Sequence, residues 1–204
     1  MPSPPYSPAA AEELLRRYRA ELARVYPTIR FIKKRHDRLS QVIDLVLRVL
    51  TLGGQRRYSS HYTTTLGASI YLPDQWEKMT ALDRYLVLRH EAVHVEQFLR
   101  YGRLRMSLRY LCWPVPFGFA WGRRQLELEG YRETLYATWQ VLGSAAARDP
   151  GLRQDIVRRF TGPDYGWMWI DGHAIDKALI DMLDYLERQP PPRLTTRPEG
   201  QHLI

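Results

Sequence analysis

The sequence predicts an α+β domain that is mostly helical and carries a small β-sheet. Long stretches repeat apolar residues at helical spacing, whereas one short stretch after residue 61 is rich in β-branched and aromatic residues. The chain has 204 residues, 45% of them hydrophobic, which is enough to bury one complete core, and it contains no internal repeat. We therefore expect one domain over residues 9–188.

The predicted elements follow one another along the chain. Residues 1–8 and 189–204 are rich in proline and are expected to be disordered. The helical patterns cover residues 9–25, about 37–51, 82–101, 124–143, 151–160 and 171–188. Residues 62–73 predict a strand or hairpin packed beside the helix that begins near residue 82.

A metal-binding pattern stands in that helix. His90, Glu91 and His94 form the motif His-Glu-x-x-His. Histidines four residues apart lie one turn apart on the same helix face, so both rings reach one cation, and Glu91 faces its open side. The alternative is a buried helix whose histidines are satisfied by the protein and whose glutamate is there by chance.

The same helix has recognisable ends. Thr80, with Asp83 three residues later, is the expected N-cap, and Gly102 is the expected end, followed by a linker. The stretch between them is apolar over most of its circumference. A helix of this kind is buried, as a helix that carries a metal in the core must be.

A catalytic zinc needs a third protein ligand, and the next helical repeats hold Gln97 and Arg100, which excludes a third histidine there. The candidates are Glu127, Glu129 and Glu133 in the following helix. Glu127 and Glu129 point to nearly opposite sides. Glu127 is favoured because its side carries uncharged residues, whereas Glu129 shares its side with charged ones. Glu133 is the third choice.

Together these motifs, over about residues 60–140, resemble the gluzincin class of zinc metallopeptidases, and among them the small single-domain members. The resemblance implies a zincin-like domain in which His90, His94 and Glu127 bind Zn²⁺ and Gly130 takes the place of a small residue. It also implies an edge strand beside the cleft, where a peptide substrate adds as another strand. Tyr131 departs from the pattern, because it stands where the family usually has an acidic residue.

The function implied by this resemblance is zinc-dependent hydrolysis of peptide bonds. Zinc with three protein ligands keeps a position open for water, and Glu91 acts first as general base and then as general acid. Tyr165 and His173 are the candidate donors to the oxyanion, although their aromatic segment is also typical of a hydrophobic plug. The alternative function is a weakly active or inactive zinc-binding domain with a structural, interaction or membrane-surface role.

The net charge of +8 raises the question of an acidic partner. Arginines surround the segment between the two ligand helices: Arg100, Arg103, Arg105, Arg109, Arg123 and Arg124. Residues 100–124 are therefore a candidate contact with an anionic membrane surface, whereas no accompanying motif favours nucleic acid. The apolar, aromatic residues 110–121 are too short, and too interrupted by proline, to cross a bilayer.

The single cysteine, Cys112, excludes an intrachain disulfide and a cysteine-based zinc ribbon. The first residues lack the apolar core of a secretory signal. A cytoplasmic location is therefore expected, with export by another route left open.

Overall fold

The computed structural model describes residues 6–34, 63–111, 120–162, 168–169 and 171–190. The helices are α1 (Pro8–Val25), α4 (Ala81–Leu111), α5 (Trp121–Leu142), α6 (Ser144–Ala147), α7 (Pro150–Thr161) and α8 (Gly172–Arg188), with a 3-10 turn, η2 (Trp76–Lys78). The strands are β1 (Arg30–Lys33), β2 (Thr64–Leu66) and β3 (Ser69–Leu72). This composition confirms the predicted α+β class.

The strands form one mixed sheet in the order β1-β3-β2. The predicted hairpin is the antiparallel pair β2–β3, in which Leu66 faces Ser69 across a two-residue loop. Gly67 begins this loop with a φ of 66°, a conformation that favours glycine. β1 pairs with β3 in parallel and was not predicted, because its four residues carry charges at both ends and are too few to show a period.

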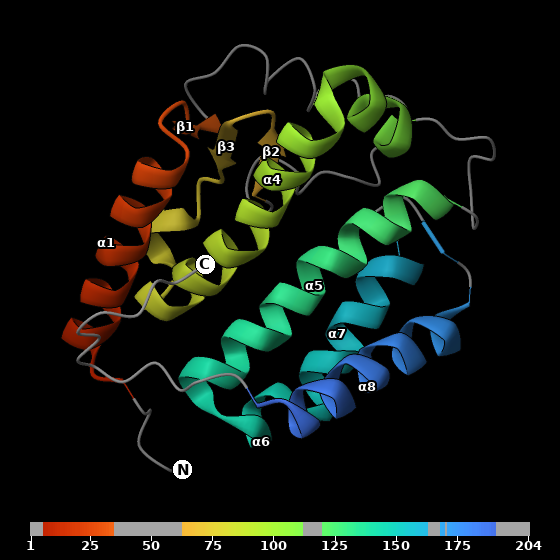
Figure 1. Cartoon of the computed structure of the whole chain (residues 1–204). Coiled ribbons are helices and arrows are strands. Elements are labelled where there is room, and N and C mark those ends of the chain that lie inside the picture. Colours follow the sequence, from red (N-terminus) through yellow and green to blue (C-terminus); the bar gives the residue numbers. More distant parts are fainter. Residues whose placement is uncertain (1–5, 35–62, 112–119, 163–167, 170, 191–204) are drawn as a thin grey trace.

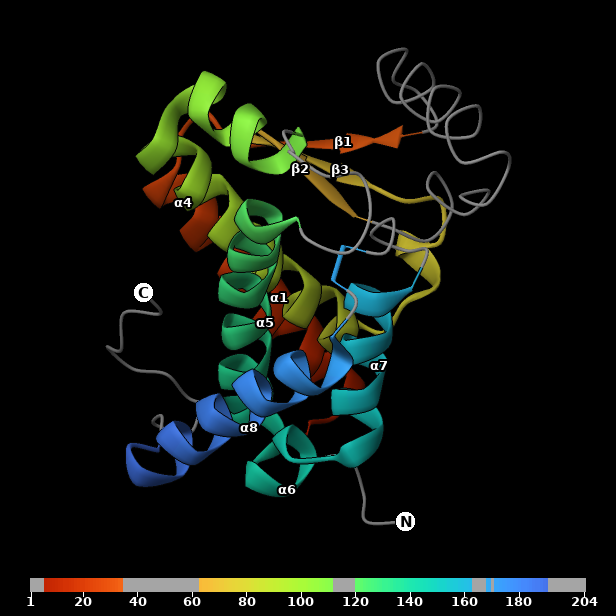
Figure 2. The ribbon, with the colours of Figure 1, turned by 90° about the vertical axis from the view of Figure 1, so that its right-hand side faces the viewer.

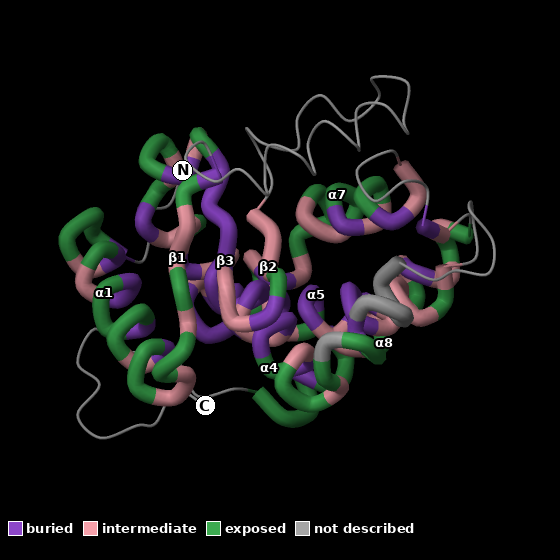
Figure 3. The backbone as a smooth tube through the Cα atoms, turned by 90° about the horizontal axis from the view of Figure 1, so that it is seen from above, coloured by how far each residue is buried: buried purple, intermediate pink, exposed green. Residues whose placement is uncertain are grey.

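The helices pack in two groups on either side of α5. α4 and α5 run side by side at the centre, with α1 on one flank and α7 and α8 on the other (Figure 1). One apolar cluster joins α1, the sheet and α4, and a second joins α5, α7 and α8. α5 contributes to both: Ala137 and Val141 belong to the first cluster, Leu128 and Leu135 to the second. The view from above shows the sheet beside α4 and away from α8 (Figure 3).

The first helix begins earlier than the sequence predicted. Ser7 caps α1 by accepting a hydrogen bond from the Ala10 amide, and Pro8 occupies the first helical turn, where its missing N–H is not needed. Tyr6 is buried in the first apolar cluster. The prediction of disorder up to Pro8 is therefore wrong for Tyr6, Ser7 and Pro8, whereas residues 1–5 lie outside the described residues.

The ends predicted for α4 are confirmed at one end and corrected at the other. The Thr80 hydroxyl accepts a hydrogen bond from the Asp83 amide at 3.1 Å, as an N-cap does. Gly102 interrupts the helix with a φ of 72°, but helical backbone resumes and continues to Leu111. The predicted linker after Gly102 is thus wrong for residues 103–111, because the kink redirects the helix without ending it.

Three other predicted features lie outside the described residues. They are the helix at about 37–51, most of the aromatic segment 110–121, and residues 191–204 of the tail. The remaining predicted helices correspond to α5, α7 and α8. Among the described helices, which Figure 2 shows from the side, none combines the length and apolar character needed to cross a membrane.

Candidate metal centre

Three side chains from two helices converge between α4 and α5. His90 and His94 come from one face of α4, and Glu127 comes from the first half of α5. Their ligand atoms all lie within 4.8 Å of one another. Glu127 is fully enclosed, and both imidazoles are nearly so. This is the set that the sequence favoured.

The spacing of the three donor atoms matches a tetrahedral metal centre. Zn–N distances of about 2.05 Å place two ligand atoms of a tetrahedron roughly 3.3 Å apart. The two histidine Nε2 atoms are 3.2 Å apart. Glu127 Oε2 lies 3.6 Å from Nε2 of His90 and 3.7 Å from Nε2 of His94. Only sub-ångström adjustment separates this arrangement from the metal-bound geometry.

A buried glutamine orients the second histidine. Nδ1 of His94 donates to the side-chain carbonyl of Gln97 at 2.9 Å. The Gln97 amide group then donates to the backbone oxygen of Leu126 at 3.1 Å and to Glu129 at 2.8 Å, both on α5. With its proton held on Nδ1, His94 turns the lone pair of Nε2 toward the shared centre.

A threonine has the same role for the first histidine. Nδ1 of His90 lies 3.2 Å from the Thr134 hydroxyl oxygen, and that hydroxyl donates its own hydrogen to the Gly130 carbonyl at 3.1 Å. The hydroxyl therefore accepts from His90, which fixes the tautomer with Nε2 free for a metal. Each of the two histidines is thus held from its far side by a residue to which the sequence had not assigned that role.

A positive charge between His90, His94 and Glu127 would be stabilised by the surrounding groups. Burial alone lowers the pKa of His94, but the carboxylate of Glu127 outweighs burial and raises that pKa to about 9. Burial likewise opposes ionisation of Glu127, yet the two histidines hold its pKa well below the ordinary value. Two lone pairs and a buried carboxylate meet at one point, an arrangement that a proton or a metal cation stabilises.

Close contact between the helices depends on Gly130. A Cβ atom at this position would lie 2.6 Å from Cε1 and 2.8 Å from Nε2 of His90, closer than side chains tolerate. The next residue, Tyr131, packs edge-on against the His90 ring with centroids 4.8 Å apart and also contacts Phe160. Tyr131 therefore packs against the His90 ring, and the Nδ1 atom of that ring donates its hydrogen bond to Thr134.

The glutamate of the motif faces the sheet. The Thr65 hydroxyl on β2 donates to Glu91 Oε2 at 2.6 Å. The negative charge of Glu91 also contributes to the raised pKa of His94, so the carboxylate lies close enough to act on the ligand group. The sheet thus positions the acidic residue of the motif, which is not among the three converging side chains.

The two other glutamates considered as ligands have different partners. Glu129 accepts from Gln97 and supports His94 indirectly. Glu133 pairs with Arg89, whose Nε donates to it at 2.6 Å. Arg89 is buried, and its guanidinium also reaches Tyr85 at 2.6 Å. This network joins α4 to α5 one residue before His90.

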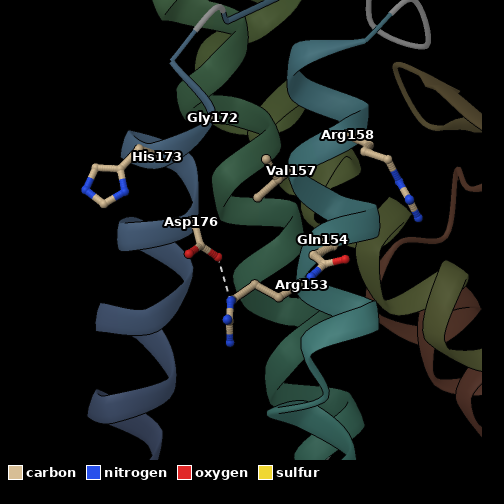
Figure 4. Close-up of a pocket in the computed structure, with 7 residues that line it drawn as sticks. All are labelled: Arg153, Gln154, Val157, Arg158, Gly172, His173 and Asp176. Carbon is tan, nitrogen blue, oxygen red and sulfur yellow. Dashed lines mark hydrogen bonds and ion pairs between the residues drawn. The ribbon is translucent and has the colours of Figure 1, made fainter.

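The two candidate oxyanion donors are not brought into the cluster. Tyr165 lies outside the described residues. His173 is exposed in the first turn of α8, at the rim of a surface depression between α7 and α8. Figure 4 shows its ring pointing outward, while Arg153 crosses the depression to Asp176 at 2.5 Å. No hydrogen bond among the described residues links His173 to the metal ligands.

Comparisons of the chain with protein-family models, with curated protein sequences and with solved structures found no match.

Proposed function

We propose that the protein is a zinc-dependent hydrolase that cleaves peptide bonds. The observation that supports this most strongly is the convergence of His90, His94 and Glu127, with both histidines held by hydrogen bonds from their far sides. Two histidines and one glutamate form one of the ligand sets of catalytic zinc, and three protein ligands leave a position for a reactant. When bound, zinc supplies Lewis-acid activation of water and of a carbonyl group.

Glu91 is the general base in this proposal. Its Oε2 atom is engaged by the Thr65 hydroxyl, which leaves Oε1 as the atom that takes a proton from water and returns it to the leaving amine. Thr65 fixes the carboxylate in one orientation, so the proton acceptor does not turn away between cycles. Glu91 is also buried, which limits competing contact with bulk water.

The position of β2 favours an extended peptide as the substrate. Within the described residues, β2 forms one edge of the sheet, with no strand on its other side. Thr65, which bonds Glu91, lies in the middle of this strand. A peptide that paired with the free edge of β2 would run past the general base, in the manner of strand addition.

The test combines metal analysis with one substitution. Protein purified without added zinc is expected to contain about one zinc per chain and to cleave an unfolded protein substrate. Glu91→Gln keeps the shape of the side chain and an oxygen for the Thr65 hydroxyl, so zinc content and thermal unfolding should not change. Hydrolysis should fall roughly 10²- to 10⁴-fold, the usual contribution of a general base.

Glu96→Gln is the matched control, because Glu96 lies on the same helix but is exposed and pairs with Arg100. It should keep full activity. A protein that binds zinc but shows no turnover in either form would support the alternative, a zinc-binding domain without catalysis. Protein that neither contains zinc nor takes it up would contradict both functions.

A further inference from the structure

Exposed apolar side chains gather at the end of the molecule where α4 kinks and α5 begins. Leu99 is 59% exposed, Leu104 is 74% exposed and Trp121 is 63% exposed. Figures 1 and 2 both place the last turns of α4 near the first turn of α5. The only other large apolar residues this exposed in the described chain are Leu66, at 42%, and Tyr185, at 41%.

Leu66, on β2, is exposed close to the same stretch of α4. The turn that follows it packs on α4, since a Cβ on Gly67 would lie 3.2 Å from the Phe98 ring, one residue before Leu99. Large apolar side chains on a surface usually occur singly, and several at one end mark an interaction site. We call Leu66, Leu99, Leu104 and Trp121 the apolar end.

Positive charge predominates around the apolar end. From Leu99 to Gln125 the sequence contains arginines and no acidic residue. Arg105 is exposed next to Leu104, and no described acidic side chain lies within ion-pair distance of it. Arg100 is also exposed, although it pairs with Glu96. Exposed leucine and tryptophan with surrounding arginine fit a partner surface that offers both apolar groups and negative charge.

We propose that the apolar end docks on an anionic lipid surface. Tryptophan and leucine insert at the boundary between headgroups and acyl chains, and arginine remains at the level of the phosphates. The anionic lipids attract the excess positive charge. The apolar end contains none of the proposed metal ligands, so its binding to lipid does not depend on the hydrolase activity.

The experiment measures sedimentation of the full chain with lipid vesicles. Vesicles of phosphatidylcholine are compared with vesicles in which roughly one third of the lipid is phosphatidylserine. We expect binding to the anionic vesicles and little binding to the neutral ones. Arg105→Gln should weaken binding about five-fold, the equivalent of one arginine near a charged surface. Leu104→Ser with Trp121→Ser should weaken it further.

Two control variants match these changes elsewhere on the surface. Lys78→Gln removes an exposed charge in η2, and Tyr185→Ser removes an exposed apolar side chain on α8. Both should bind vesicles as the unchanged protein does. Absence of binding, or equal loss in the control variants, would overturn the proposal. So would a dimer in lipid-free solution that the Leu104 and Trp121 substitutions dissociate, because the apolar end would then belong to a second copy of the chain.

Discussion

The candidate metal centre and the depression between α7 and α8 both contain histidine and carboxylate groups. Only in the candidate centre do these groups converge on one point. In the centre, the far nitrogen of each imidazole has a hydrogen-bond partner, and the near nitrogens converge on Glu127. In the depression, Asp176 is taken by Arg153, and the His173 ring points to solvent (Figure 4).

The difference between these regions lies in what surrounds each histidine. His90 and His94 are fixed in ring position and in tautomer by Thr134 and Gln97, whereas no described side chain bonds to His173. Holding a ligand ring before the metal arrives lowers the entropy lost on binding. The following predictions test whether this surrounding structure, and not the presence of histidine alone, makes the site.

The largest effect is expected from the third ligand. Glu127→Gln removes the buried carboxylate and should lower zinc affinity by more than the roughly 100-fold that is the upper range for an outer-shell residue. Glu129→Gln should have the smaller effect because Glu129 acts only through Gln97. Competition with a chromophoric chelator measures both affinities. The reverse order would show that Glu129 is the ligand.

The next effect concerns the partner of His94. Gln97→Leu keeps the bulk of the side chain but removes the acceptor for Nδ1, so the ring is no longer held in one tautomer. Zinc affinity should fall about 10- to 100-fold, as is usual when such a partner is lost. Gln154→Leu, an exposed glutamine on α7, is the control and should leave affinity unchanged. Equal affinity in both variants would show that the Gln97 contact does not matter for binding.

A smaller effect is expected where α5 approaches the His90 ring. Alanine in place of glycine inside a helix is ordinarily favourable by about 1 kcal/mol. Gly130→Ala should instead destabilise the protein by about 1–3 kcal/mol, because its Cβ overlaps the imidazole. Chemical denaturation of the metal-free protein measures the change. In a His90→Ala background the same substitution should be neutral or stabilising, and a persistent loss there would place the clash elsewhere.

The smallest effect is expected in the depression. His173→Ala removes an exposed ring and should change zinc affinity and stability by less than about 0.5 kcal/mol. The same titration and denaturation experiments measure both quantities. If the variant keeps its zinc but loses hydrolysis, His173 acts on the substrate, and the sequence-based assignment of an oxyanion donor regains support.

The convergence of His90, His94 and Glu127 was predictable because its signals are local. The spacing of His90 and His94 places them on one helix face, and the uncharged side of α5 singled out Glu127. That same side includes Thr134, so its contact with His90 was implicit in the helix wheel but not assigned. The hydrogen bond from Thr65 to Glu91 joins residues 26 positions apart in the sequence. Neither segment carries a local signal that indicates this bond.

Helices and strands also divide into those with local sequence signals, which were predicted, and those that depend on distant contacts, which were not. α1, α5, α7 and α8 have long apolar periods and were predicted, whereas the four-residue β1 gains its structure only by pairing with β3. Gly102 was predicted to end α4, but it only interrupts the helix. Whether a helix ends or resumes after such a break depends on what its next turn packs against, and Met106 is indeed buried. Tertiary packing decides that outcome.

The double burial of α5 has a consequence for how long the centre would keep an ion. One side of this helix belongs to the cluster around α1 and α4, and the other belongs to the cluster around α7 and α8. Rotating or sliding the helix would open both clusters at once, so Glu127 stays in place relative to the two histidines. A zinc ion bound at this centre, as proposed, would therefore be released slowly. A metal-carrier protein must take up and release its ion, and so it requires a ligand that can move out of the site.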